Sequence, residues 1–316
     1  MPLTTAKKPL AKTVFPHKDF ISIADLSCDD ISHVLDLAEH YVVQNRRMSQ
    51  INALLKGLVM INLFLENSTR TRLSFEMAAK RLGAGVINMT AEGSSIKKGE
   101  SFIDTLKTLN AMRPDLLIIR HSEENSAHKA ADILECPVIN AGDGTGEHPT
   151  QAMLDALTLR RHFRSLKELN VTICGDILHS RVAHSNGILL KKMGANVKWV
   201  GPQEFLPPSL DKATTSMEEG LSGADAVMVL RIQKERLQKS PSFTEESYFR
   251  DYGLTTEKLA LAKEGAVILH PGPMNRGIEI EATLADDPGR SLITMQVEMG
   301  VAVRIACLDL LTRHRR

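Results

Sequence analysis

A regular alternation between short apolar runs and segments of helical periodicity constrains the fold of this chain more than any other feature of its sequence. The apolar runs, such as 115–120 (DLLIIR) and 226–232 (AVMVLRI), are continuous, which is typical of strands buried on both faces. Segments with the periodicity of helices, such as 126–134, separate them. Because strands and helices take turns along the whole chain, we predict parallel β-sheets covered by helices on both faces.

The alternation yields a complete set of predicted elements. The predicted strands are 58–66, 85–90, 115–120, 137–142, 170–177, 196–202, 226–232 and 266–272. The predicted helices are 29–46, 70–82, 100–112, 126–134, 148–163, 181–193, 216–223, 255–263 and 292–313.

The same rhythm occurs twice, and the glycine-rich stretch 142–147 interrupts it once. We therefore predict an α/β protein of two domains, each an open parallel sheet flanked by helices. The first domain is 1–147, completed by a C-terminal helix (292–316) that packs back on it, and the second is 148–291. The apolar face of the C-terminal helix is predicted to consist of Val297, Val301, Ile305, Leu308 and Leu311.

Composition and charge argue against several classes of protein. The formal net charge is +1, from 39 basic and 38 acidic side chains, whereas nucleic-acid binders are usually more basic. The four cysteines are far apart and form no metal-binding pattern with histidine, so we expect free thiols, no metal and a reducing compartment. No apolar run is long enough to span a bilayer, and residues 1–12 lack the apolar core of a secretory signal. We expect a cytoplasmic protein that binds neither nucleic acid nor membrane.

The strongest local signal is 62–76 (NLFLENSTRTRLSFE), where a predicted strand runs directly into a helix. Backbone N–H groups at a helix N-terminus and the helix dipole both favour an anion there. The hydroxyls of Ser68, Thr69 and Thr71 add donors, and an arginine, Arg70, adds a planar group suited to phosphate. An ordinary N-cap at Ser68 or Thr69 is the alternative. Two arginines in the first turn, where the dipole disfavours cations, favour the anion site.

Further polar side chains follow other predicted strands. In 142–157, His148 and Gln151 are three residues apart at a helix start, so both can face one ligand. A neutral histidine there can donate to a carbonyl oxygen, although a capping histidine is the alternative. Arg120 ends a strand, where an arginine is usually aimed at a ligand or an acid. Ligands of open α/β sheets bind at the carboxyl ends of the strands, which favours one common site.

The second half carries its own candidates. Arg181 opens a helix, which is an unfavourable place for a cation unless an anion is near. Arg231 and Gln233 follow a strand and, by alternation, lie on the same side. The loop 93–101 (GSSIKKGES) is polar and bounded by glycine, so composition alone indicates a solvated surface loop.

The motif S-T-R-T-R followed by S-F-E resembles the carbamoyl-phosphate loop of the aspartate/ornithine carbamoyltransferase family, and the resemblance covers roughly 15–312. It implies transfer of a carbamoyl group from carbamoyl phosphate to an amino acid, without metal or cofactor. It implies that Arg70, Thr71 and His148 are catalytic, as donors to the developing oxyanion. The implied carbamoyl-phosphate ligands are Ser68, Thr69, Arg70, Thr71, Arg120, His148 and Gln151.

The resemblance also implies how the amino acid is held and how subunits assemble. A loop serine and lysine would enter the site from the neighbouring subunit, which implies a homotrimer with shared sites. Larger assemblies with regulatory or dihydroorotase-like chains are left open. The implied aspartate ligands are Lys98, Arg181, Arg231 and Gln233. The implied residues from the neighbouring subunit are Ser94 and Lys98, and the implied backbone contacts are Pro271 and Gly272, where many members of the family have leucine in place of the glycine.

Aspartate is the expected acceptor. The motifs are H-P-T-Q, R-I-Q-K-E-R and H-P-G-P, whereas the family's ornithine enzymes typically carry H-P-C-Q and H-C-L-P. Arg181 and Arg231 also suit a dicarboxylate on Coulomb grounds. An ornithine carbamoyltransferase and a catalytically silent homologue in a pyrimidine complex are the alternatives. A dinucleotide-binding oxidoreductase and a P-loop kinase are disfavoured, because the chain lacks their glycine-rich motifs.

Overall fold

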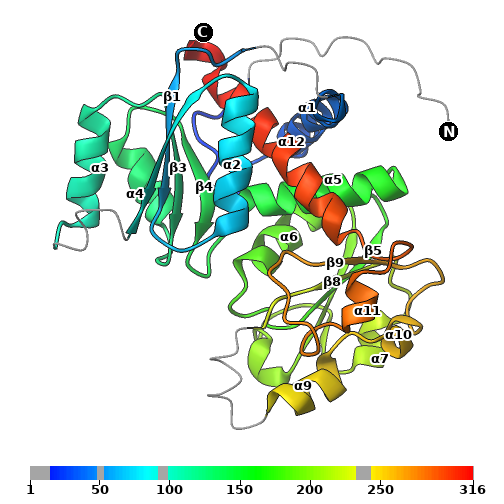
Figure 1. The fold of residues 1–316 in the computed structure, drawn as a ribbon. Helices are drawn as coiled ribbons and strands as arrows, with labels where there is room; N and C mark the ends of the chain where they lie inside the picture. The colour runs from blue at the N-terminus through cyan, green and yellow to red at the C-terminus, as the bar shows by residue number, and fades with distance from the viewer. Residues whose placement is uncertain (1–14, 48–52, 92–98, 233–242, 316) are drawn as a thin grey trace.

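The computed structural model describes residues 15–47, 53–91, 99–232 and 243–315. Two parallel sheets form the framework of this described part, and helices run between them (Figure 1). The strand order is β2-β1-β3-β4 in the first sheet and β7-β6-β5-β8-β9 in the second. The predicted architecture of two open parallel sheets with flanking helices is confirmed.

Helices cover both faces of the first sheet. Its strands are β1 (Val59–Phe64), β2 (Gly85–Thr90), β3 (Leu116–His121) and β4 (Val138–Asp143). Its helices include α1 (Cys28–Arg46), α2 (Thr69–Arg81), α3 (Phe102–Ala111) and α4 (Ser126–Ile133). Leu117 and Ile119 of β3 share a core with α3 and α4, whereas Leu116 and Ile118 share another core with α1 and α2. Burial on both faces explains why these strands are continuous apolar runs.

The second sheet is built in the same way from shorter strands. These are β5 (Asn170–Cys174), β6 (Asn196–Val200), β7 (Ala213–Thr214), β8 (Ala226–Val229) and β9 (Val267–Leu269). The helices around it are α6 (Arg181–Lys192), α7 (Met217–Leu221), α9 (Glu245–Tyr252), α10 (Thr256–Leu259) and α11 (Ala282–Ala285), with a 3-10 turn at Gln203–Phe205. Ala226 and Met228 of β8 pack into one core, and Val227 and Val229 pack into another.

Two helices join the sheets. α5 (Pro149–Phe163) leads from β4 toward β5 and packs against α1, α6 and α12. The C-terminal helix α12 (Ile293–Thr312) packs against α1, α2 and α5, so it returns to the first sheet as predicted (Figure 1).

The predicted apolar face of α12 is partly wrong. Val297 is 58% exposed and Val301 is half-buried, whereas Ile305, Leu308 and Leu311 are buried as expected. From Met299 onward the helix is buried on nearly every side, because it packs against α1, α2 and α5. A helix in such a place has no single apolar stripe.

Other differences concern short or polar elements. The sequence did not predict β7, α9 or α11. α9 begins with a capping box between Thr244 and Ser247, and buries only Tyr248 among its eight residues, so its apolar periodicity is weak. Predicted strands are also too long: the one expected at 226–232 ends at Val229.

None of the four cysteines forms a disulfide, and three of them are buried. None of the helices in the described ranges combines the length and apolar character that a bilayer span requires.

Candidate functional site

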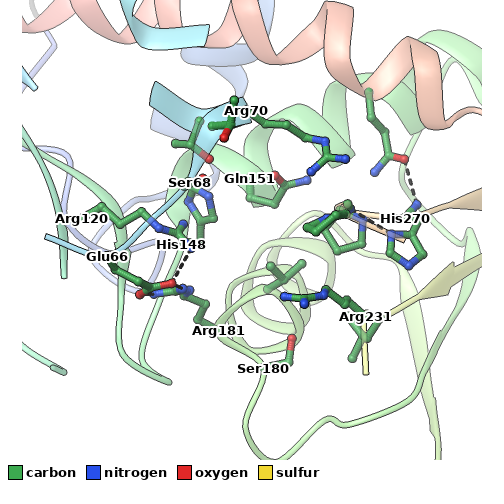
Figure 2. A pocket seen from close by; sticks show the side chains of 18 of the residues that line it. Glu66, Ser68, Arg70, Arg120, His148, Gln151, Ser180, Arg181, Arg231 and His270 are labelled. Carbon is green, nitrogen blue, oxygen red and sulfur yellow. Dashed lines mark hydrogen bonds and ion pairs between the residues drawn. The ribbon is translucent and has the colours of Figure 1, made fainter. Parts of the chain in front are cut away.

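The carboxyl ends of strands from both sheets open onto one cleft of about 630 Å³. Figure 2 shows Arg70 entering it from one side and Arg231 from the other. Ser94, Lys98 and Gln233 lie outside the described residues. Each of the other predicted site residues lines the cleft: Ser68, Thr69, Arg70, Thr71, Arg120, His148, Gln151, Arg181, Arg231, Pro271 and Gly272.

The loop between β1 and α2 forms one wall. Ser68 occupies the N-cap position with extended backbone, but its side chain makes no capping hydrogen bond. The first turn of α2 holds no acidic residue, and Arg70 follows immediately. Ser68 therefore occupies the N-cap position, but the prediction that its hydroxyl caps the helix is wrong. The helix N-terminus, the hydroxyls and Arg70 together favour an anion.

Glu66, which was not among the predicted site residues, connects the side of the cleft formed by the first sheet to the side formed by the second. Glu66, just after β1, accepts from Arg120 Nη2 at 2.7 Å and from Arg181 Nη1 at 2.9 Å. Burial alone would raise the pKa of Glu66, but the hydrogen bond from Arg181 and the charges of both arginines hold that pKa below its usual value. Burial and the neighbouring Arg181 lower the pKa of Arg120 to about 10, so this arginine stays charged.

His148 is the buried N-cap residue of α5, and its backbone N–H donates to Ser185 Oγ at 2.9 Å. Its side chain makes no capping hydrogen bond, and Nδ1 has no partner among the described residues. Burial lowers the pKa of His148 well below 6.5, and the charges of Arg120 and Arg304 lower it further. The imidazole is therefore neutral at physiological pH and can donate one N–H.

Gln151 lies one helical turn along α5 and also faces the cleft. Its Nε2 donates to the buried carboxylate of Asp155 at 3.0 Å. The same carboxylate oxygen accepts from Gln296 Nε2 on α12 at 2.7 Å. Asp155 thus holds the NH₂ group of the Gln151 amide, and the amide oxygen is available to a ligand in the cleft.

The loop after β9 forms the far wall. The backbone N–H of His270 donates to Gln296 Oε1 at 2.9 Å, and the backbone N–H of Gly272 donates to His270 Nδ1 at 2.9 Å. Gly272 adopts a left-handed conformation with φ +64°, and a Cβ there would lie 3.0 Å from Arg70 Nε. The glycine therefore lets this loop approach the arginine of the first sheet closely.

Arg181 and Arg231 bring positive charge from the second sheet. Arg181 opens α6, and its guanidinium faces Glu66. Arg231 lies two residues after β8 and is exposed to the cleft. The cleft thus combines a helix N-terminus that favours an anion beside the first sheet, a neutral histidine, and two arginines that follow strands of the second sheet. In the described part of the chain, no cluster of three or more acidic, cysteine or histidine side chains could hold a metal ion.

Two family models match most of the chain. One is described as "Aspartate/ornithine carbamoyltransferase, carbamoyl-P binding domain" and matches residues 18–161. The other is described as "Aspartate/ornithine carbamoyltransferase, Asp/Orn binding domain" and matches residues 167–311. The chain belongs to the aspartate/ornithine carbamoyltransferase family. The first sheet lies within the first match, and the second sheet lies within the second.

Individual members of the family are similar over nearly the whole chain. The "Aspartate carbamoyltransferase catalytic subunit" of Rhodospirillum centenum is 56% identical and covers 96% of this chain and 97% of its own. An aspartate transcarbamoylase structure from Trypanosoma cruzi, described as a complex with carbamoyl phosphate and aspartate, is 31% identical, with TM-score 0.79 and coverage of 93% and 96%. The catalytic subunit from M. jannaschii is 33% identical, with TM-score 0.83 and coverage of 94% and 99%.

Sequence reasoning missed several residues that this carbamoyltransferase places around its cleft. Glu66 lies two residues before the first residue of the S-T-R-T-R motif, so its position after the strand was a usable signal. Arg304 lines the cleft from α12, is buried, donates to Ser74 Oγ at 2.7 Å and lies over the ring of Phe75. Nothing in the sequence near Arg304 separates it from a surface arginine.

Proposed function

We propose that this chain is an aspartate carbamoyltransferase, which joins carbamoyl phosphate and L-aspartate to give N-carbamoyl-L-aspartate and phosphate in pyrimidine biosynthesis. The observation that carries this proposal is the cleft itself. A helix N-terminus with arginine and hydroxyls suits a phosphate, while Arg181 and Arg231 on the other sheet suit a dicarboxylate. Curated relatives at 51–56% identity carry the name of this enzyme.

In this proposal the first sheet holds carbamoyl phosphate. The phosphate lies at the N-terminus of α2, where backbone N–H groups and hydroxyls donate to it. The carbamoyl group lies toward α5, where a neutral histidine and an amide are available. The proposed ligands are Ser68, Thr69, Arg70, Thr71, Arg120, His148 and Gln151.

Aspartate binds between the sheets, with its carboxylates on arginines of the second sheet. Arg181 and Arg231 are the proposed charge partners, together with Gln233 and with Lys98 of a neighbouring subunit. The carbonyls of Pro271 and Gly272 face the amine. Ornithine carries a cationic side chain in place of a carboxylate, so two arginines disfavour it.

The chemistry needs positioning and charge stabilisation. The amine of aspartate attacks the carbonyl carbon, and the C–O bond to phosphate breaks as the tetrahedral intermediate collapses. Arg70, Thr71 and His148 donate to the oxyanion of that intermediate. The departing phosphate accepts the amine proton, so no enzyme base is required. Holding two substrates in line supplies a large part of the acceleration, on the order of several kcal/mol.

We further propose a homotrimer with shared sites as the minimum active unit. Leu73 and Met77, one turn apart on α2, are 52% and 49% exposed, and Ile87 on the edge strand β2 is 54% exposed. Apolar side chains of this size at a sheet edge favour an interface with another chain. The segment with Ser94 and Lys98 follows β2 directly in the sequence, which suits delivery of both residues to a neighbour.

The remaining proposals concern organisation. We place the domain boundary between 147 and 148, with 292–316 completing the first domain. Regulatory or dihydroorotase-like chains would add to the trimer and are not needed for the chemistry. Four dispersed cysteines without a disulfide suit a reducing compartment such as the cytoplasm.

Calorimetric titration of an Arg231→Ala variant tests the proposal. Carbamoyl phosphate should bind as it does to the unchanged protein, because its proposed ligands are intact. Aspartate, added to the complex with carbamoyl phosphate, should give no measurable heat of binding. Normal aspartate binding by this variant would contradict the assignment of the second sheet.

A further inference from the structure

Asp155 is a buried carboxylate that does not line the cleft. It lies on α5, one turn beyond Gln151, and its side chain is fully buried. Burial raises the pKa of Asp155 to about 7, although hydrogen bonds from Gln296, Asn186 and Gln151 and the charge of Arg304 lower it. Burying a carboxylate away from water is unfavourable unless hydrogen bonds satisfy its oxygen atoms. The side chains that donate to Asp155 therefore decide whether it can be tolerated behind the residues that line the cleft.

Three amides from three helices donate to this carboxylate. Gln151 of α5 and Gln296 of α12 donate to Oδ1, at 3.0 and 2.7 Å. Asn186 of α6 donates to Oδ2 at 2.8 Å. An ionised carboxylate only accepts hydrogen bonds, so each amide must turn its NH₂ end toward Asp155.

The orientation of these amides decides what the cleft presents to a ligand. Gln151 gives its NH₂ to Asp155, and its Oε1 is left as an acceptor toward the cleft that it lines. Gln296 gives its NH₂ to the same oxygen, and its Oε1 accepts from the backbone N–H of His270. Asp155 therefore fixes the orientation of the acceptor oxygen of Gln151 directly. Through Gln296 and His270 it also fixes the start of the loop that contains Pro271.

Acceptor oxygens beside the acyl group can distinguish two chemically similar substrates, carbamoyl phosphate and acetyl phosphate. Carbamoyl phosphate and acetyl phosphate share the acyl phosphate and differ by NH₂ against CH₃ on the acyl carbon. The NH₂ group can satisfy acceptor oxygens, whereas the methyl group leaves them unpaired. A site built to hydrogen-bond a ligand rejects analogues that lack the donor for this reason.

We propose that Asp155 is a positioning residue that selects a carbamoyl over an acetyl donor, by fixing the amide of Gln151 with its oxygen toward the acyl group and by holding Gln296 against His270. The inference rests on the proposed function, because it assumes that the carbamoyl group lies at Gln151. Asp155 itself touches no substrate. It acts only through the orientation of the two glutamines.

The test compares dissociation constants for carbamoyl phosphate, acetyl phosphate and inorganic phosphate by calorimetry at pH 8. In Asp155→Leu the preference for carbamoyl over acetyl phosphate should fall by about tenfold, as expected for the loss of one hydrogen bond. The affinity for inorganic phosphate should stay within about twofold, since the phosphate loop is untouched. Asp155→Asn keeps an acceptor oxygen and should retain most of the preference.

Asn186→Ala is the matched control. It removes the third hydrogen bond to the same carboxylate, but Asn186 does not line the cleft, so the preference should not change. If Asp155→Leu does not yield folded protein, Asp155→Val must give the same result. An unchanged preference in a folded variant, or equal weakening of all three ligands, would overturn the inference.

Measurements on the unchanged protein distinguish a failure of the proposed function from a failure of the role of Asp155. If it forms carbamoyl aspartate and prefers carbamoyl phosphate, but Asp155→Leu keeps that preference, only the role of Asp155 is wrong. If it shows neither turnover nor preference, the proposed function fails and this inference fails with it.

Discussion

Glu66 and Arg181 form a two-point ion pair that connects the end of β1 to the start of α6, across the cleft between the two sheets. The two residues are far apart in the sequence, and they follow strands of different sheets, β1 and β5. Arg120 donates to the same carboxylate, so one acidic side chain holds two arginines of the site. Charged hydrogen bonds in such a partly buried place are stronger and less screened than surface pairs.

Glu66→Gln should therefore lower catalytic efficiency with aspartate while the protein stays folded. The neutral amide cannot pair with both guanidinium groups, so Arg120 and Arg181 lose their fixed positions. A loss of about 2 kcal/mol corresponds to about thirtyfold in kcat/KM. Steady-state kinetics checks this, with Asp36→Asn as the control, because Asp36 pairs with Arg160 at a surface site away from the cleft. Equal kinetics in both variants would contradict a role for the Glu66 pair.

Gly272→Ala tests the close approach between the loop after β9 and Arg70. Its Cβ would lie 3.0 Å from Arg70 Nε and would also strain a residue at φ +64°. Gly277 in the same loop has φ +80° but open space around its Cβ position, so Gly277→Ala carries backbone strain alone. Both variants should lose about 1 kcal/mol of stability. Only Gly272→Ala should lose kcat, by about tenfold or more, and similar kcat values would argue against the contact.

The carboxyl of Asp155 predicts a dependence of stability on pH. Its pKa is raised from 3.8 to about 7, so the folded protein binds this proton more tightly than the unfolded chain does. The stability that Asp155 contributes is therefore fully present below about pH 4 and is lost as the pH rises toward 7. The charge of Arg304 favours the ionised form of Asp155 and lowers its pKa, but by less than burial raises it.

Thermal unfolding of Asp155→Asn checks this sign. At pH 5 the protonated acid and the amide are both neutral, so the variant and the unchanged protein should unfold at similar temperatures. At pH 8 the variant should unfold at the higher temperature, because it has no buried charge to desolvate. A difference in unfolding temperature that does not change with pH would contradict the raised pKa.

Subunit mixing tests the shared site. Lys98→Ala and Arg70→Ala trimers should each be nearly inactive, because each removes a proposed ligand from every site. Mixed trimers would contain some sites in which both residues are unchanged, one from each chain. Dissociation and reassembly of the mixture should therefore restore part of the activity. Mixtures that stay inactive, with trimers shown by light scattering, would contradict the proposal.

Much of the fold follows from local patterns. Continuous apolar strands such as β3 reflect burial on both faces, and this pattern depends on neighbouring residues alone. Residues placed just after strands, such as Arg70 and His148, were predicted for the same reason, since strand ends of parallel sheets meet at one edge.

Relations between distant segments were not predicted. A carboxylate at Glu66 has no local feature that identifies Arg181 as its partner. Asp155 lies on a helix that is buried almost throughout, where apolar spacing does not distinguish a core position from a functional one. The exposure of Val297 depends on how α12 passes between other helices, and this cannot be read from its own periodicity.

Phosphate release measures the central claim most directly, with carbamoyl phosphate and either L-aspartate or L-ornithine as the second substrate. The arrangement of Arg181 and Arg231 opposite the phosphate loop predicts turnover with aspartate and none with ornithine. Turnover with ornithine would contradict the assignment of the second sheet. No turnover with aspartate, in a folded protein that binds carbamoyl phosphate, would contradict the proposed activity.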